Sequence, residues 1–302
     1  MKFYLSTAIS LTVLIGLSGC QTTNNEANTK ATVNERALPL AAAVQVRYQD
    51  EVNLLRIDQL LLNQKELPTE QRARLFYQRA LIYDRMGLNG HSRYDLSQTL
   101  SLDPSFAPAY NTLGLYYLLI GSFNEALESF DSALELSDNM QYSYLHRAIG
   151  LYEIGRYSLA SKDIESFYGL DKSDPYRILW RYIINSKVDQ TRALNNLKAA
   201  QKLNKDKRFA WLIVDVIAGR LNEKDFLHSI SYGVTKNEAL AQRLCEAYFY
   251  LGSWHKIKGN INKAIYYFKL STATNIHDFI EYKYALIELA SIQRMINAKP
   301  AN

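Results

Sequence analysis

The chain has 302 residues, 48% of them hydrophobic and 22% charged, with a formal net charge of +5 at pH 7. This length is ample for a helical core, and two cysteines, Cys20 and Cys245, are too few for a framework of disulfides. No segment has the alternating pattern of a β-strand, so the sequence predicts an all-α fold.

Residues 1–19 are predicted to be a lipoprotein signal peptide. One positive charge, at Lys2, precedes an apolar run over residues 9–17 that is too short and too early for a stable membrane span. The sequence Leu-Ser-Gly-Cys at residues 17–20 resembles a bacterial lipobox, in which the cysteine is acylated and begins the mature protein. The alternative is an ordinary cleaved signal with an incidental cysteine, but the small residues before Cys20 favour lipidation.

The residues after the cysteine indicate the compartment. In Gram-negative lipoproteins an aspartate at that place retains the protein at the inner membrane, so Gln21 implies the periplasmic side of the outer membrane. Several acyl chains would hold the protein there, because each buried methylene contributes about 0.8 kcal/mol. Residues 20–40 combine the lipidated Cys20 with a polar segment that predicts a flexible tether. Cys245 is then left as a free cysteine, expected in the core rather than in redox chemistry.

Residues 41–66 predict an N-terminal helix that lies outside any repeat. Its apolar side chains, including Tyr48, Leu55 and Leu62, form a stripe wider than a capping helix needs. Two uses of this surplus surface stay open: it covers the free face of the first repeat, or it packs on a second copy and makes a homodimer.

Four segments carry the same scattered residues, three of them at intervals of 34 residues. Each is centred on a glycine, with a bulky residue and then a small residue before it, and a small residue and then an apolar residue after it. In order, these positions hold Phe76, Ala80, Gly87, Ser92 and Leu96; Tyr110, Gly114, Gly121, Ala126 and Phe130; Tyr144, Ala148, Gly155, Ala160 and Ile164; and Tyr248, Gly252, Gly259, Ala264 and Phe268. This period is typical of the tetratricopeptide (TPR) repeat, a helix–turn–helix unit that stacks on copies of itself.

The repeats divide the folded part of the chain into a TPR-type helical-repeat solenoid. Three units cover residues 73–174 and a last unit covers residues 245–278, and each glycine ends a first helix. Residues 175–236 lack the repeat markers and predict four helices, as degenerate repeats. Residues 279–297 predict a C-terminal capping helix. In that helix Ile280, Tyr284, Leu286, Ile287 and Ala290 would face inward, and Glu281, Lys283, Glu288 and Arg294 outward.

Charge is distributed unevenly along the repeats. Residues 175–236 contain twelve Lys or Arg against five Asp or Glu, whereas residues 73–140 contain four against eight. Solvated helix faces are the usual reason for such charges. A nucleic-acid partner is not expected behind a secretion signal, so a functional basic surface, with Arg177, Arg181 and Lys187, would meet acidic proteins, lipid head groups or wall polymer.

No catalytic residue, metal site or cofactor is predicted, and the chain is not expected to be an enzyme. The five histidines are far apart, and there is no HExxH motif, no cysteine pair for zinc, no Gly-x-Ser-x-Gly elbow and no phosphate-binding loop. Asp131 and Glu135 are spaced like paired carboxylates, but on a repeat helix such pairs usually face solvent. His146 could bind a ligand, although a structural histidine is the better interpretation.

The first helices of TPR units line a concave groove, which predicts the binding site. The groove residues expected to contact a partner are Arg74, Tyr77, Arg85, Asn111, Tyr142 and Tyr152, with Asp84 and several leucines among them. Such an aromatic and aliphatic trough suits an extended or helical peptide, while about half of the leucines are expected between helices instead. The clamp that grips a C-terminal carboxylate in chaperone-binding TPR domains is absent from the matching positions.

Further short motifs accompany the lipobox, the tether and the separated last repeat. They are Leu113-Gly114, Phe130-Asp131-Ser132, Leu134-Glu135-Leu136, Asp174-Pro175, Tyr250-Leu251-Gly252 and Tyr284-Ala285-Leu286-Ile287-Glu288-Leu289. The combination resembles the NlpI family of outer-membrane lipoproteins over nearly the whole chain. It departs from the family in a longer, more polar tether and in residues 298–302, which are not an acidic tail.

The resemblance implies a non-catalytic adaptor, lipid-anchored at the outer membrane on its periplasmic side. Members of the family dimerise, bind a periplasmic tail-specific protease and present murein endopeptidases to it. They thereby restrain cell-wall hydrolysis during growth and division. Two other functions stay open: a lipoprotein that assists the assembly of outer-membrane β-barrels, and a wall hydrolase, against which the missing catalytic motifs argue.

Overall fold

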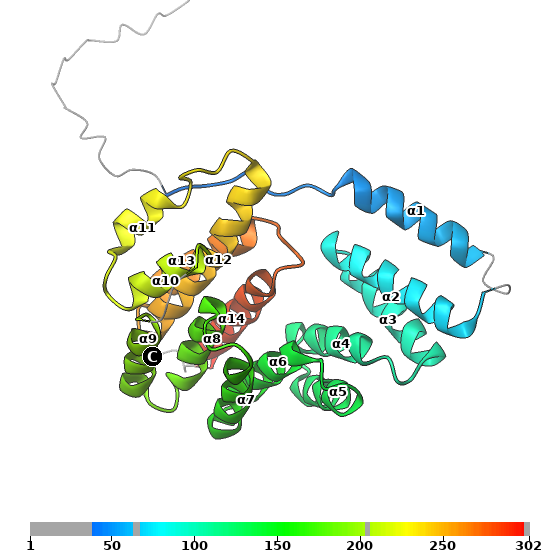
Figure 1. Cartoon of the computed structure of the whole chain (residues 1–302), viewed down its shortest axis with the longest axis horizontal. Coiled ribbons are helices and arrows are strands. Elements are labelled where there is room, and N and C mark those ends of the chain that lie inside the picture. The colour runs from blue at the N-terminus through cyan, green and yellow to red at the C-terminus, as the bar shows by residue number, and fades with distance from the viewer. Residues whose placement is uncertain (1–37, 63–66, 203–205, 299–302) are drawn as a thin grey trace, which may run out of the picture. The chain divides into compact units, whose positions relative to one another are not determined.

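The computed structural model describes residues 38–62, 67–202 and 206–298. These residues form fourteen α-helices and no strand, which confirms the all-α fold of TPR-type helical repeats (Figure 1). The predicted signal peptide, Cys20 and nearly all of the tether lie outside the described residues. None of the helices within these ranges is long and apolar enough to cross a membrane.

Consecutive helices pair as the 34-residue period predicts. The pairs are α2 (Thr69–Arg85) with α3 (Asn89–Leu102), α4 (Ala107–Leu119) with α5 (Phe123–Leu136), α6 (Gln141–Glu153) with α7 (Tyr157–Leu170), and later α12 (Asn237–Ile257) with α13 (Ile261–Ala273). The repeat glycine lies between the two helices of each pair, with φ of 74° at Gly87, 78° at Gly121, 77° at Gly155 and 81° at Gly259. Because other residues rarely adopt this left-handed conformation, glycine fixes where each first helix ends.

The small residues of the pattern let the paired helices touch. A Cβ atom built on Gly114 would lie 2.5 Å from the ring of Phe130, and one on Gly252 would lie 2.7 Å from the ring of Phe268. Both phenylalanines are fully buried. A glycine in the first helix and a phenylalanine in the second therefore form one packing unit, which recurs in two of the pairs.

Among the described residues, four helices lie between the third pair and the last pair, the number that the sequence predicts. They are α8 (Pro175–Asn185), α9 (Gln190–Ala200), α10 (Ala210–Ile217) and α11 (Glu223–Ser229). The side chain of Asp174 caps α8 by accepting a hydrogen bond from the backbone N–H of Tyr176 at 2.8 Å. Apolar residues of this segment, such as Trp180 and Trp211, share one large core with the pairs on either side.

The N-terminal helix is shorter than the sequence predicts. Helix α1 spans Tyr48–Leu62, so the prediction of a helix from residue 41 is wrong. The preceding residues bind the C-terminal part of the chain instead. The Val44 N–H donates to the carbonyl of Thr274 at 3.0 Å, and the Ala42 N–H donates to Oδ1 of Asn237 at 2.9 Å. These N–H groups would be unpaired in the first turn of a helix that begins at residue 41, and here they are satisfied by the C-terminal part of the chain.

Helix α1 covers the free face of the first repeat, the first of the two uses expected for it. Ile57 and Leu61 of α1 pack in one cluster with Leu75 and Phe76 of α2. The other side of α1 remains exposed.

Two arginines on first helices each bind carboxylates of the two helices on either side. Arg79 of α2 donates to Asp58 of α1 and to Asp95 of α3, both at 2.7 Å. Two repeats later, Arg147 of α6 joins α5 to α7 through Asp131 and Asp163 in the same way. Helix α1 thus stands where the second helix of a preceding repeat would stand.

The C-terminal helix α14 (Ile280–Asn297) does not cap the stack with a single apolar face. Glu281, Lys283 and Glu288, predicted to face outward, are buried, whereas Leu286 and Ala290, predicted to face inward, are exposed. The reason is that α14 packs on α12 and α13 and also contacts α4, so protein surrounds it on two sides (Figure 1). Its charged groups find partners there, which a pattern of charge along the sequence does not reveal.

We expect Gly114→Ala to lower the free energy of unfolding by about 1–3 kcal/mol, because the added methyl group would overlap Phe130. Gly90→Ala is the matched control, since nothing lies within 4 Å of its Cβ position on α3. It should leave stability unchanged or raise it by up to about 1 kcal/mol through helix propensity. Urea unfolding followed by circular dichroism measures both changes. Equal effects at the two glycines would contradict the packing unit.

Candidate functional site

Helix α14 lies against the first helices of the N-terminal repeats, which carry the predicted groove residues. Nζ of Lys283 lies 3.0 Å from Oδ2 of Asp84 on α2. Farther along α14, Arg294 lies 3.4 Å from Glu153, the last residue of α6. The groove that the sequence offers to a partner thus contains a helix of the chain itself.

The ion pair between Lys283 and Asp84 is almost completely buried, with 6% and 8% of the two residues exposed. The other oxygen of Asp84 accepts a hydrogen bond from the Tyr116 hydroxyl at 2.6 Å, and Lys283 also donates to the carbonyl of His277 at 2.5 Å. Removing one partner of such a pair typically costs about 3–5 kcal/mol, because the other charge stays buried. Asp84 is therefore engaged by α14 rather than available to a ligand.

His146 is fully buried beside α14. Its Nδ1 lies 2.5 Å from the hydroxyl of Tyr284. Burial, with a smaller effect of the nearby Lys283 charge, lowers the pKa of His146 to about 3. A neutral imidazole in a buried hydrogen bond is a structural contact, in line with the structural interpretation of this residue.

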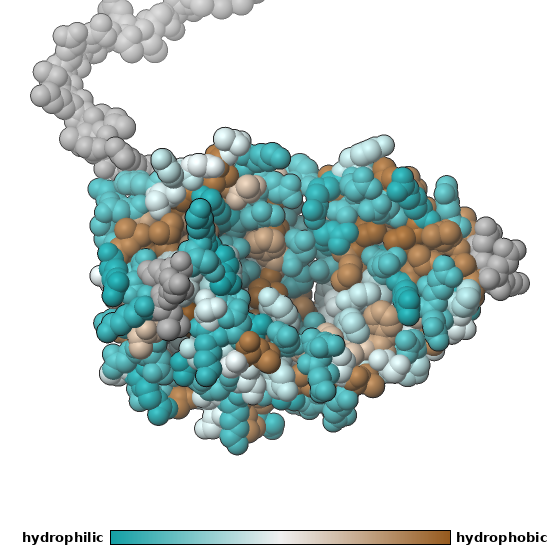
Figure 2. All heavy atoms as spheres, in the orientation of Figure 1, coloured by the Kyte–Doolittle hydropathy of each residue, from teal (hydrophilic) through white to brown (hydrophobic). Residues whose placement is uncertain are grey.

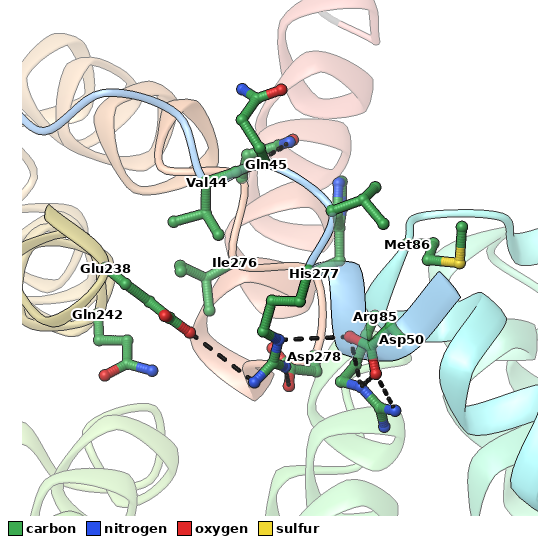
Figure 3. A pocket seen from close by; sticks show the side chains of 13 residues that line it. Val44, Gln45, Asp50, Arg85, Met86, Glu238, Gln242, Ile276, His277 and Asp278 are labelled. Atoms are coloured by element: carbon green, nitrogen blue, oxygen red, sulfur yellow. Dashed lines mark hydrogen bonds and ion pairs between the residues drawn. The ribbon is translucent and has the colours of Figure 1, made fainter. Parts of the chain in front are cut away.

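Arg85 lies in a small pocket of about 90 Å³ where α1, α2, the start of α12 and the loop before α14 meet (Figure 3). Arg85 donates to Asp50 at 2.6 Å. Arg47 adds ion pairs to Asp50 at 3.3 Å, to Asp278 at 3.7 Å and to Glu238 at 3.8 Å. Each of these charged side chains has an ion-pair partner within the pocket, so the pocket is a junction between elements and Arg85 is part of that junction.

The six predicted contact residues do not form one open surface. Asn111 accepts a hydrogen bond from Ser143 at 2.8 Å, and the ring of Tyr77 packs 4.9 Å from that of Phe106. Overall, Arg74 and Tyr142 are exposed, Tyr77, Arg85 and Asn111 are half-buried, and Tyr152 is buried. Of the aromatic residues predicted for the groove, Tyr142 is thus the one that a partner can reach readily.

Tyr142 belongs to an open pocket that the sequence does not predict. The pocket has a volume of about 300 Å³ and is formed by α6, α7, α8, α12 and the start of α14. It is named the aromatic pocket here, and its lining includes Tyr142, Phe167, Tyr176, Trp180, Glu246 and Glu281. One signal of it exists in the sequence, because Glu246 is a lone acidic residue in the otherwise apolar run 244–251.

Two of the three basic residues named for a partner surface are less accessible than their charge suggests. Arg177 is buried and donates to the carbonyl of Phe167 and to Oε1 of Gln141, and Arg181 donates to Glu165 at 2.7 Å. These arginines hold α8 to α6 and α7. The prediction of a partner contact is therefore wrong for the buried Arg177, whereas Arg181 is half-buried. Lys187 is exposed.

A second, wider pocket of about 620 Å³ lies on residues 206–243. Arg208 and Arg243 line it together with Asp206 and Asp225, and Tyr232 stands exposed at it. Its charges are mixed, so it is not the basic surface that the composition predicts.

The described residues contain no group of three or more His, Cys, Asp or Glu side chains placed to hold a metal ion. Cys245 is fully buried, and burial raises the pKa of its thiol to about 12. The thiol is protonated at neutral pH and acts as a small core residue.

No family model matches the chain. Among solved structures, the chain is similar to YrrB, described as a TPR protein with an unusual peptide-binding site, at 15% identity and a TM-score of 0.43, over 76% of this chain and 96% of that one. It is similar to MamA at 13% identity and a TM-score of 0.40, over 77% and 98% of the two chains. It is also similar to PilF of Pseudomonas aeruginosa at 16% identity and a TM-score of 0.43, over 72% and 97%. Identities this low do not bear on function.

Proposed function

We propose that the chain is a non-catalytic scaffold that holds other proteins. The observation that carries this proposal is the stack of TPR units, since helices packed side by side present long surfaces for contact. The open aromatic pocket adds a concave site to these surfaces. Because α14 fills the predicted groove, we place partner contacts at the pocket and on the outer helix surfaces instead.

We further propose that the scaffold is an adaptor at the outer membrane, on its periplasmic side. The lipobox at residues 17–20 and the resemblance to the NlpI family support this proposal. Its partners would be a tail-specific protease and murein endopeptidases, and the adaptor would regulate cell-wall hydrolysis by bringing them together.

Reconstitution from purified components tests the adaptor function. With protease and endopeptidase held constant, adding the chain should shorten the half-life of the endopeptidase about tenfold, because bound partners meet at a high effective concentration. The chain alone should cleave neither the endopeptidase nor murein. An unchanged half-life would refute the adaptor function, and capture of barrel-assembly proteins instead would favour the alternative.

Changing Cys20→Ala tests the anchor. We expect the variant to remain an unlipidated precursor and to disappear from the outer-membrane fraction, because the acylated side chain is lost. Incorporation of labelled palmitate measures the first effect and membrane fractionation the second, with circular dichroism as the folding control. A variant that is still acylated and membrane-bound would rule out the lipobox.

We also propose that the exposed side of α1 forms a homodimer. Tyr48, Leu55 and Leu62 are spaced seven residues apart and so lie on one face of the helix. Their exposed fractions are 78%, 64% and 82%. Hydrophobic side chains gather over α1 and α2 in the space-filling view (Figure 2). An apolar row of this kind is typical of a surface that packs on another helix.

Sedimentation of the chain at micromolar concentration should give twice the monomer mass. The double variant Leu55→Asp with Leu62→Asp should sediment as a monomer, because two charges would be buried in the interface. The double variant Leu159→Asp with Leu170→Asp is the control, since it changes two exposed leucines on α7. A wild-type monomer, or equal loss of mass in both variants, would be incompatible with a dimer through α1.

A further inference from the structure

The aromatic pocket holds two carboxylates without a matching positive charge. Glu246 of α12 accepts a hydrogen bond from the Tyr176 hydroxyl at 2.8 Å, and Glu281 of α14 accepts one from the Tyr250 hydroxyl at 2.9 Å. Glu281 is only 5% exposed, and Glu246 is half-buried. Among the described residues, no Lys, Arg or His forms an ion pair with either carboxylate within 4.0 Å. Buried charges in proteins are normally paired, so this arrangement calls for a cation.

The arginine that lines the pocket does not supply this charge. The guanidinium of Arg177 donates to the carbonyl of Phe167 and to Gln141 at 2.8 Å, and its carbon lies 4.1 Å from the centre of the Phe167 ring. Its Nε lies 3.9 Å from Asp174, so its one ion pair is with this aspartate and not with either glutamate. Arg177 is therefore committed to α6, α7 and the cap of α8.

The walls of the pocket suit a cation with an apolar stem. Aromatic faces attract ammonium and guanidinium groups, and Tyr142, Phe167, Tyr176, Trp180 and Phe279 all line this pocket. Trp180 is 3% exposed, and its indole Nε1 has no hydrogen-bond partner in the described part of the chain. An indole N–H only donates, so it contributes nothing to binding the cation, which has no acceptor.

We propose that the aromatic pocket binds a guanidinium or ammonium group, presented as an arginine or lysine side chain of a partner protein. The cation would pair with Glu246 and Glu281 and lie against the aromatic walls. A volume of about 300 Å³ is at the lower end of the range of ligand pockets, which suits one side chain. The proposal rests on the proposed scaffold function in one respect, that the cation belongs to a partner protein. A free amine would offer the pocket the same charged group.

Ionisation of the two glutamates destabilises the empty pocket. Burial raises the pKa of both glutamates, and the charge of Glu281 raises that of Glu246 further. The folded chain then binds these protons more tightly than the unfolded chain. The stabilisation from these bound protons is present at acid pH and is lost as the pH rises through the raised pKa values of the two glutamates. Other titratable or charged groups around the pair are Tyr142, Asp174, Tyr176, Arg177, Arg243, Cys245, Tyr250, Asp278 and Tyr284.

Calorimetric titration of the full chain at about pH 8 tests the proposal. The probes are the peptide acetyl-Ala-Arg-Ala-amide, the same peptide with neutral citrulline in place of arginine, and the free amine agmatine. We expect the arginine peptide to bind about tenfold or more tightly than the citrulline peptide. Equal binding of the two peptides, or no binding at about 10 mM, would overturn the proposal.

Charge-removing variants separate a binding function from a structural one. Glu246→Gln and Glu281→Gln should each weaken the arginine peptide about tenfold and, at the same pH, raise the melting temperature, because a charge without an ion pair is removed from a buried or half-buried position. Glu135→Gln, on the exposed face of α5, should change neither quantity. Glutamine variants that bind as well as the wild type, or that only lose stability, would contradict a cation site.

The wild type alone provides a second measurement if a variant does not fold. Its affinity for the arginine peptide should fall as the pH is lowered from about 8 to about 5, since protonation removes the two negative charges. An affinity independent of pH would also overturn the proposal. Agmatine that binds as tightly as the peptide would identify a free amine as the source of the cation. Failure of the protease reconstitution would leave these titrations unchanged, so the two proposals can fail separately.

Discussion

The buried ion pair between Lys283 and Asp84 is the contact on which the arrangement of the described residues depends. It holds the last helix in the groove of the first repeats. Tyr116 donates a second hydrogen bond to Asp84 there, and His146 binds Tyr284 of the last helix. The same insertion places the start of α14, with Glu281, at the wall of the aromatic pocket. One helix therefore decides which part of the repeat surface is closed and which stays open.

The repeat pattern was predictable because its causes are local. Gly121 must adopt a left-handed backbone and Gly114 must admit Phe130, and both constraints act within one helix pair. The orientation of α14 was not predictable in this way. The sequence pattern predicted that Lys283 and Glu288 face solvent, yet their partners, Asp84 and Lys256, lie on other helices, 199 and 32 residues away. A sequence pattern does not distinguish a paired buried charge from an exposed one.

The candidate site shows the same limit. Tyr142 follows from its position in a repeat, but Trp180, Glu246 and Glu281 come from three other helices. The one indication in the sequence is Glu246, a lone acidic residue in the apolar run 244–251. Such a site depends on how distant helices are packed. The same holds for Arg177 and Arg181, which the composition of residues 175–236 assigned to a basic surface and which bind Gln141 and Glu165 of neighbouring helices instead.

The long-range contacts have a consequence for how the chain folds. In a simple solenoid each repeat contacts only its neighbours, so folding can spread from any point. Here Asp84 and Lys283 are 199 residues apart, and Val44 and Asn275, which share a hydrogen bond, are 231 apart. Contacts of such sequence separation form slowly, and these two cannot form during synthesis before Asn275 and Lys283 have left the ribosome. Until then the groove and the segment before α1 lack their partners, and the nascent chain exposes surfaces that the finished protein buries.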